Sequence, residues 1–317
     1  MNAPKTKLLF TLPSYAYLEA RFCEAGAFER GEIERKTFPD GERYLRIATE
    51  IMGRDVVLLG GTPTDLDALE LYDLGYAISR GGARSLSVVM PYFGYATMER
   101  AVRPGEVVTA KARARLISAI PACEEGMRVF LFDLHTDGVA YYFSDSHVTH
   151  HIYGAPLVTA LIKKRMGSRP FVLGATDAGR AKWVQSLAQK LGVEPAFVYK
   201  RRDTAAKGKM SVTGINADVR GREVMVYDDM IRTGTSLLQA GRAYLAAGAT
   251  EVHALASHLV LPGDSLAKLR ASGVFKSISG TDSHPGSLQL AEDPEALVSV
   301  AELLAGALDG VKEPHLS

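Results

Sequence analysis

The chain has 317 residues, 47% of them hydrophobic and 23% charged, and a formal net charge of +1. At roughly 100–200 residues per domain, this length predicts about two domains. The near-neutral charge argues against binding of nucleic acid through bulk electrostatics, and no run approaches the roughly 18 apolar residues that a membrane span needs.

The N-terminal residues 1–20 are predicted to contain a leading strand, and they lack the apolar stretch and cleavage site of a secretory signal. Cys23 and Cys123 have neither metal-binding nor redox spacing, so we expect free thiols in a reducing compartment. These features predict a protein of the cytoplasm that contacts neither nucleic acid nor membrane.

Short β-rich runs then alternate with amphipathic helical segments. The apolar runs predict strands at 55–61, 85–93, 128–134, 170–177, 196–201, 222–229 and 251–261. The amphipathic segments predict helices at 65–79, 110–120, 157–165, 178–191 and 236–247. This alternation predicts an α/β fold with parallel sheets and flanking helices, divided into two similar halves, 1–148 and 149–317. Ligands of such folds bind beyond the carboxyl ends of the strands.

The most specific single motif is VMVYDDMIRTGTSLLQAG, residues 224–241, where an apolar strand ends in Asp228 and Asp229 and a helix opens at residues 233–236. Backbone N–H groups at a helix start suit a phosphate monoester, and Gly234 lets the backbone approach the anion closely. The carboxylates suit sugar hydroxyls or Mg²⁺. An ordinary capped helix explains the threonines and the serine but not two adjacent acids after a buried strand.

Three consecutive cations, Lys200, Arg201 and Arg202, precede the polar segment DTAAKGK. This segment is expected to be mobile, and a mobile cationic loop could close over a nucleotide and exclude water. Taken alone, a solvated basic turn explains the same residues.

Asp133 and His135 lie at the end of another apolar run, two residues apart, and are therefore expected on the same face of a strand. Taken alone, a histidine at a strand end is more often structural. The segment SHVTHH also spaces His147, His150 and His151 as metal ligands are spaced, but it has no cysteine or HExxH context. We expect those three histidines at the surface or in an interface.

Five further segments occur in order: FPDGERYLRI (38–47), residues 91–121 from PYFGYATMER onward, FDLHTDGVAYYFSD (132–145), ATDAGRAK (175–182) and VYKRRD (198–203). With the 224–241 motif, they resemble the ribose-phosphate pyrophosphokinase family from about residue 38 to about residue 285. The resemblance implies an α/β fold of two tandem phosphoribosyltransferase-like domains, each a mainly parallel sheet with flanking helices. It also implies Mg²⁺-dependent transfer of the β,γ-diphosphoryl group of ATP to the 1-hydroxyl of ribose 5-phosphate, giving phosphoribosyl pyrophosphate and AMP.

The resemblance assigns roles to matching residues. Lys200, Arg202 and His135 match catalytic residues. Asp133, His135 and Asp177 match ligands of the metal, and His135 also contacts the nucleotide. The adenine site is matched by Phe38, Asp40 and Glu42, contributed by a neighbouring subunit of a homo-oligomer, and further ATP contacts by Glu99 and Arg100. The ribose 5-phosphate loop is matched by Asp228, Asp229, Arg232, Thr233, Gly234, Thr235 and Ser236.

Some residues depart from the common bacterial pattern. ATMER stands where many members have ARQD, so Thr97 and Met98 replace a cationic and an amide side chain, and Arg232 stands where an aspartate is usual. The C-terminal VKEPHLS also lacks a serine-rich ending. The T-x-E-R pattern, the RPGEVVTA that follows it and YYFSD are similar to the class II type. The missing ending and the altered nucleotide segment predict an enzyme that inorganic phosphate does not activate and that accepts nucleotides besides ATP.

Two other functions stay open. A phosphoribosyltransferase that consumes phosphoribosyl pyrophosphate would share the 224–241 motif but would not explain the segments at Phe38, His135 and Lys200. A catalytically silent regulatory relative would explain the departures at Thr97, Met98 and Arg232, but not the retention of His135, Lys200 and Arg202.

Overall fold

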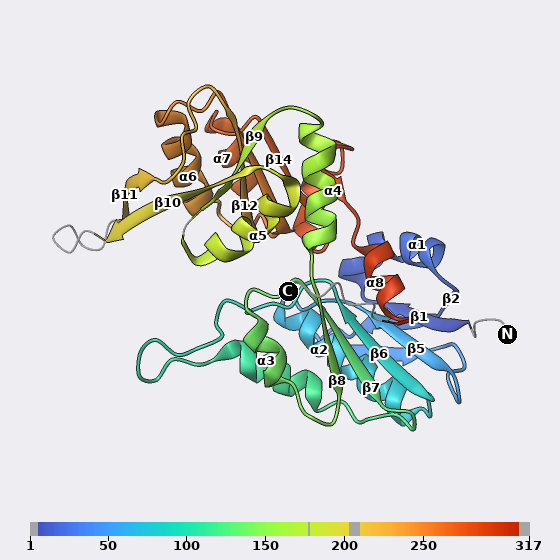
Figure 1. The fold of residues 1–317 in the computed structure, drawn as a ribbon. Helices are drawn as coiled ribbons and strands as arrows, with labels where there is room; N and C mark the ends of the chain where they lie inside the picture. The colour runs from blue at the N-terminus through green and yellow to red at the C-terminus, as the bar shows by residue number, and fades with distance from the viewer. Residues whose placement is uncertain (1–5, 177, 203–209, 311–317) are drawn as a thin grey trace. The chain divides into compact units, whose positions relative to one another are not determined.

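The computed structural model of the chain describes residues 6–176, 178–202 and 210–310, and the chain divides into two units. Unit 1 runs up to Tyr153 and resumes at Val300, and unit 2 comprises Gly154–Ser299. Each unit is a mainly parallel sheet with helices on its faces (Figure 1). The predicted fold class is confirmed.

Unit 1 contains a six-stranded sheet in the order β2-β1-β5-β6-β7-β8, in which every neighbouring pair is parallel. Its strands are β1 (Lys7–Thr11), β2 (Phe28–Arg30), β5 (Asp55–Leu59), β6 (Ser85–Met90), β7 (Met127–Phe132) and β8 (Val148–Ile152). Its helices are α1 (Ala16–Ala25), α2 (Asp65–Arg80), α3 (Thr109–Ser118) and α8 (Ala301–Ala307), with 3₁₀ turns η1 (Pro13–Tyr15) and η2 (Asp137–Tyr142). A separate antiparallel hairpin joins β3 (Ile33–Thr37) to β4 (Arg43–Ile47).

Unit 2 contains a seven-stranded sheet in the order β11-β10-β9-β12-β13-β14-β15, in which only the β10–β11 pair is antiparallel. Its strands are β9 (Phe171–Ala175), β10 (Glu194–Arg202), β11 (Met210–Ile215), β12 (Glu223–Ile231), β13 (Glu251–Leu259), β14 (Ser277–Thr281) and β15 (Leu297–Val298). Its helices are α4 (Ala155–Met166), α5 (Ala181–Leu191), α6 (Thr235–Ala246) and α7 (Ser265–Ala271), with 3₁₀ turns η3 (Ala178–Arg180) and η4 (Pro285–Leu290).

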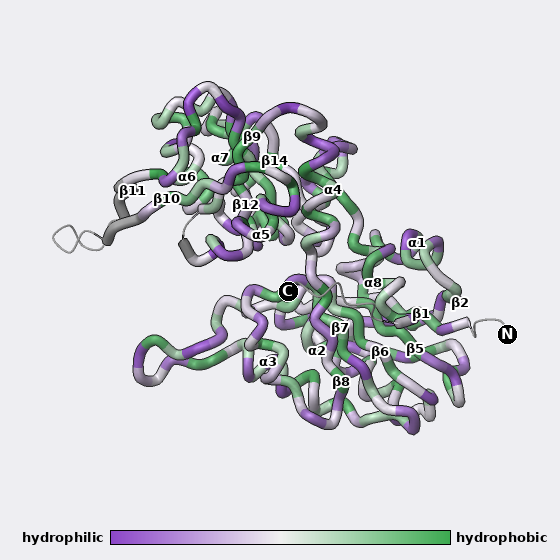
Figure 2. Tube along the Cα trace, in the orientation of Figure 1, coloured by the Kyte–Doolittle hydropathy of each residue, from purple (hydrophilic) through white to green (hydrophobic). Residues whose placement is uncertain are grey.

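The central strands carry apolar side chains on both faces, and helices cover both faces, as is typical of parallel sheets. In β12, Val224 and Val226 enter the hydrophobic cluster on one face, and Met225 and Tyr227 enter the cluster on the other. Hydrophobic residues follow the central strands of each sheet (Figure 2). Burial on both faces leaves the strand ends as the places where polar side chains reach the surface.

The last described helix belongs to unit 1, although the sequence-based division placed its residues in the second half. Helix α8 packs against α1, and the Lys7 Nζ atom lies 2.5 Å from Asp309 Oδ1. Leu304 and Ala305 are buried there. Apolar residues on α8 are thus buried in unit 1, although α8 follows unit 2 along the chain.

Two smaller observations complete the fold. Cys23 and Cys123 are free thiols, as predicted. In the described part of the chain, no helix combines the length and the apolar character needed to cross a membrane.

Candidate active site

The acid pair at the end of β12 is held by residues that follow β9. The Thr176 hydroxyl donates a hydrogen bond to Asp228 Oδ2 at 3.0 Å, and the Asp229 backbone N–H donates to Asp228 Oδ1 at 3.0 Å. The Asp229 carboxylate is buried and pairs with the Arg180 guanidinium, with Nη2 2.6 Å from Oδ2. Thr176 and Arg180 belong to the predicted ATDAGRAK motif, from which only Asp177 was selected as a site residue.

Burial raises the pKa of Asp228, one of the two acids. Desolvation raises the pKa of the Asp228 carboxyl to about 7, and the neighbouring Asp229 charge adds to this increase, while the Thr176 hydrogen bond and the Arg180 charge oppose it. Near neutral pH, Asp228 therefore exists in both its protonated and its ionised form. A carboxyl in this state can both donate and accept hydrogen bonds, which suits vicinal sugar hydroxyls.

The turn after β12 exposes the groups that the phosphate motif predicted. Arg232, Thr233, Thr235 and Ser236 are exposed, and the Thr233 and Thr235 hydroxyl oxygens lie 3.1 Å apart. The N-cap residue of α6 is Gly234, which has no side chain to cap the helix, and the first-turn N–H groups of a helix have no partner within it. This is the local geometry that binds anions.

Gly234 is required at this turn for two reasons. Its φ is +73°, in the left-handed region that other residues rarely adopt. A Cβ at this position would also lie 2.5 Å from Leu269 Cδ2. The turn therefore depends both on the backbone conformation at Gly234 and on its close packing against Leu269.

In unit 1, the chain leaves the sheet at Asp133. Strand β7 ends at Phe132, and Asp133 has a φ of +42°. The expectation that Asp133 and His135 share a strand face is wrong, because the alternation of strand side chains stops before them. Asp133 is buried and His135 is half-buried beyond the end of β7.

The turn at Asp133 is held by β8. Of the three histidines that we expect at the surface or in an interface, His147 is buried and His150 and His151 are half-buried. The Asp133 N–H donates to the Ile152 carbonyl at 2.8 Å, and the Leu134 N–H donates to His151 Nε2 at 2.9 Å. Burial lowers the pKa of His151, which keeps this nitrogen available as an acceptor. His147 is buried with Nε2 3.0 Å from the Ser118 carbonyl, and His150 stacks on Phe130. The histidines pack because β8 completes the sheet beside β7.

The FPDGE segment forms the tight turn of the β3–β4 hairpin. The Phe38 N–H donates to the Glu42 carbonyl at 2.8 Å, and the Gly41 N–H donates to the Phe38 carbonyl at 2.9 Å. The Asp40 carboxylate accepts from the Glu42 N–H at 3.0 Å. The Phe38 side chain nevertheless remains 46% exposed at the tip. Turn chemistry thus explains Asp40 and Gly41, and the partly exposed Phe38 ring lies edge-on to Tyr44, with ring centroids 6.4 Å apart.

A buried carboxylate fastens this hairpin to the unit. Glu70 of α2 is 3% exposed, accepts from Arg35 Nε at 2.9 Å and pairs with Arg43. Arg35 also donates to the Thr11 carbonyl at 3.2 Å. No sequence motif marks Glu70, because its position on a helix far from the FPDGE segment gives no local signal.

Glu99 and Arg100 lie in the loop between β6 and α3. The Tyr142 hydroxyl donates to the Glu99 carbonyl at 2.5 Å, and Arg100 Nε lies 3.4 Å from Glu99 Oε1. The Arg100 side chain is 78% exposed. The backbone of the loop is therefore anchored, while the cation of Arg100 faces solvent.

The predicted catalytic cations lie on β10. Lys200 pairs with Val212 and Arg202 with Met210 across the antiparallel β10–β11 ladder. The described part of the structure does not include Asp177 or residues 203–209. It also does not include the side chains of Lys200 and Arg202. Their assignments remain predictions.

The unit 1 residues offer a donor set that suits Mg²⁺. This ion is usually held by one or two carboxylates together with water and substrate phosphates, and Asp133 supplies one carboxylate. The imidazole of His135 is a poorer ligand for this ion than oxygen is. The set therefore fits a metal held mainly through Asp133 and through phosphate oxygens.

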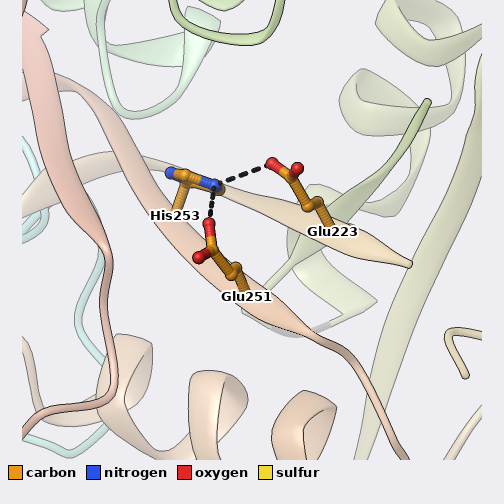
Figure 3. A group of neighbouring side chains, drawn as sticks. All are labelled: Glu223, Glu251 and His253. Atoms are coloured by element: carbon orange, nitrogen blue, oxygen red, sulfur yellow. Dashed lines mark hydrogen bonds and ion pairs between the residues drawn. The ribbon is translucent and has the colours of Figure 1, made fainter. Parts of the chain in front are cut away.

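A different group of ligand-type side chains lies at the start of β12 and β13 (Figure 3). The ligand atoms of Glu223, Glu251 and His253 lie within 4.8 Å of one another. His253 Nε2 is 3.1 Å from Glu223 Oε2, and its Nδ1 is 2.8 Å from Ser277 Oγ. Arg169 pairs with Glu223 and Lys276 with Glu251. Two protein cations thus balance the two carboxylates, and this cluster is a structural ion network.

Comparisons with known proteins agree with the motifs. A family profile described as the N-terminal domain of ribose phosphate pyrophosphokinase matches residues 7–120, and a phosphoribosyl transferase domain profile matches residues 151–279. The chain is 33% identical over 305 residues to a ribose-phosphate pyrophosphokinase of Gloeobacter violaceus, covering 95% of this chain and 88% of the relative. A Methanosarcina mazei protein of the same name is 34% identical over 298 residues, covering 94% of each chain.

A solved structure gives the same picture. The phosphoribosylpyrophosphate synthetase of Mycobacterium smegmatis matches with a TM-score of 0.83 and 25% identity, covering 96% of this chain and 98% of that one. The likeness therefore spans both units.

Proposed function

Because the chain belongs to the ribose-phosphate pyrophosphokinase family, we propose that it transfers the β,γ-diphosphoryl group of ATP to the 1-hydroxyl of ribose 5-phosphate in the cytoplasm. The products are phosphoribosyl pyrophosphate and AMP. The observation that carries the proposal is the end of β12, where an acid pair precedes an uncapped helix start.

In unit 2, the first-turn N–H groups of α6 and the hydroxyls of Thr233, Thr235 and Ser236 bind the 5-phosphate, and Arg232 adds a cation. Asp228 and Asp229 face the ribose hydroxyls. The helix start at Gly234 supports this assignment, because a glycine has no side chain to cap the first-turn N–H groups.

In unit 1, the exposed ring of Phe38 stacks on the adenine base. Asp40 and Glu42 accept hydrogen bonds from its amino group, and Glu99 and Arg100 supply further ATP contacts. His135 contacts the nucleotide. Mg²⁺ would be held by Asp133 and His135, and the third proposed ligand, Asp177, belongs to unit 2. When bound, the metal shields the charge of the triphosphate.

Lys200 and Arg202 stabilise the charge that develops on the transferring group. Diphosphoryl transfer needs little covalent chemistry from the protein, so positioned cations supply most of the catalysis. The placement of both residues on one strand beside an antiparallel partner supports a common role.

Release of AMP that depends on ribose 5-phosphate tests the proposal. Purified protein with ATP and Mg²⁺ should produce AMP only when ribose 5-phosphate is added. A phosphoribosyltransferase would instead release pyrophosphate from phosphoribosyl pyrophosphate and a base, and a silent regulatory relative would release no AMP while still binding nucleotide. Either of those results would refute the proposal.

We also propose that the enzyme does not need inorganic phosphate for activity and accepts donors besides ATP. Thr97 and Met98 support this proposal by replacing charged and amide groups in the nucleotide segment, and Met98 is 45% exposed. Rates with ATP, GTP and CTP in a phosphate-free buffer test it. Strict dependence on phosphate together with exclusive use of ATP would contradict it.

Finally, we propose a homo-oligomer in which Phe38, Asp40 and Glu42 of one subunit serve the nucleotide site of its neighbour. The exposure of Phe38 at the tip of a hairpin supports this arrangement, because an aromatic ring at a hairpin tip is suited to reach another chain.

A further inference from the structure

Arg180 has no role in the assignments above, yet it makes the closest contact to the acid pair. It ends η3, just before α5, and its side chain is 20% exposed. Its Nη2 atom lies 2.6 Å from Oδ2 of Asp229, whose side chain is 6% exposed. Such a pair excludes most of the water that would otherwise screen the charges, so each partner depends on the other.

The carboxylates of Asp228 and Asp229 lie close in sequence to the proposed phosphate site, so their charge must be compensated. Asp228 and Asp229 lie in the last four residues of β12, and the turn that follows, residues 232–236, is the proposed phosphate site. Two unpaired carboxylates so close in sequence to this turn would repel a phosphate dianion. The guanidinium of Arg180 neutralises one of them, and the Thr176 hydroxyl hydrogen-bonds the other.

The segment that carries Arg180 also packs against the C-terminal part of β12. Trp183, on the first turn of α5, stacks on Tyr227 with ring centroids 3.9 Å apart and an interplanar angle of 14°. The buried Tyr227 hydroxyl lies 2.9 Å from Ser257 Oγ. Three successive residues of β12 are therefore each held by a side chain from the segment after β9. Trp183 stacks on Tyr227, Thr176 hydrogen-bonds Asp228, and Arg180 pairs with Asp229.

We propose that Arg180 is a positioning residue of the sugar-phosphate site: it orients the Asp229 carboxylate and cancels its charge, so that an acid pair and a phosphate can occupy neighbouring positions. This inference rests on the proposed function of residues 228–236. Arg180 does not itself contact the substrate in this account.

Calorimetric titration of the full-length protein with ribose 5-phosphate, and separately with ATP, tests the inference. Arg180→Gln should weaken ribose 5-phosphate binding at least tenfold while changing ATP binding less than twofold. Arg180→Lys, which keeps the charge, should bind ribose 5-phosphate with an intermediate affinity. Because Arg180 acts through Asp229, the double variant Arg180→Gln/Asp229→Asn should bind ribose 5-phosphate no more weakly than Asp229→Asn alone.

Arg169→Gln is the matched control, because Arg169 pairs with Glu223 at the opposite end of β12, 3.0 Å between Nη1 and Oε2. It should leave ribose 5-phosphate affinity unchanged.

Four results would overturn the inference. Arg180→Gln could lower the melting temperature yet bind ribose 5-phosphate as the wild type does, which would make the residue structural and leave the proposed function standing. Equal losses for both substrates, or additive losses in the double variant, would also refute it. Wild-type protein that does not bind ribose 5-phosphate would refute both the inference and the proposed function.

Discussion

At the scale of single residues, Asp228 shows how burial turns an ordinary acid into a group that titrates near neutral pH. Its folded pKa of about 7 lies above the usual value of 3.8, chiefly because burial penalises the charged form. Between these two values the folded state binds more protons than the unfolded state does. The stability carried by the protonated form is therefore complete below about pH 3.8 and is lost as the pH rises to about 7.

Asp228→Asn removes this titration. Relative to the variant, the wild-type protein should lose free energy of unfolding as the pH rises from about 5 to about 7, and the difference should then level off. Urea unfolding of both proteins at several pH values between 5 and 8 measures this. A difference between the two proteins that does not change with pH would contradict the raised pKa.

Lys200 is expected to act mainly in the transition state. Lys200→Ala should lower kcat about 100-fold or more, with a much smaller change in KM for either substrate. Steady-state kinetics of AMP release measure both constants. The exposed Lys190 of α5 provides the control, since Lys190→Ala should leave both constants unchanged. Nearly intact turnover in Lys200→Ala would show that the catalytic assignment is wrong.

At the scale of elements, the β3–β4 hairpin depends on a carboxylate from another element. Glu70→Gln would leave Arg35 and Arg43 without their buried counter-charge, which typically costs about 3–5 kcal/mol. The loosened hairpin should raise KM for ATP more than KM for ribose 5-phosphate, because Phe38 lies at its tip. Kinetics and urea unfolding test both effects.

The control for Glu70 lies on the same hairpin. Glu34 pairs with Lys36 and Arg46 at the solvent-exposed surface, and exposed pairs of this kind contribute little. Glu34→Gln should therefore change neither stability nor KM appreciably. Similar losses in the two variants would contradict a special role for the buried pair.

Elements with strong apolar patterns could be predicted from the sequence, and elements defined by distant partners could not. The apolar run before Asp228 identified β12, and the helix at residues 236–247 began within a residue of α6. Strand β8, with the sequence VTHHI, has no such pattern, so the sequence alone does not predict a strand there. Likewise, nothing near Asp229 in the sequence indicates Arg180, because the contact exists only after β9 and β12 pair.

At the scale of the whole molecule, two similar folds divide the proposed binding functions. The motifs assigned to ATP lie in unit 1, and the ribose 5-phosphate turn and the cationic strand lie in unit 2. The return of α8 to unit 1 shows that the division is not a simple cut of the chain. No local sequence signal marks this return, because α8 is an ordinary apolar helix whose partner, α1, lies at the other end of the chain.

A shared nucleotide site predicts that two inactive variants can restore each other. Phe38→Ala and Lys200→Ala should each be impaired, yet mixed oligomers should regain activity, since some sites combine an intact Phe38 with an intact Lys200. Co-expression of the two variants and assay of AMP release measure this. A mixture of Lys200→Ala with Arg202→Ala should show no recovery, because both residues serve the same site from one subunit. Failure of the first mixture to exceed the sum of its parts would contradict a shared site.

The proposed reaction is defined by the group that is transferred from ATP to the sugar. Phosphorus NMR of a reaction containing ATP, Mg²⁺ and ribose 5-phosphate measures this directly. We expect equal amounts of AMP and of a sugar that carries a diphosphate at C1, with no ADP. Formation of ADP with a singly phosphorylated C1, or loss of ATP without any new sugar phosphate, would contradict the proposed reaction.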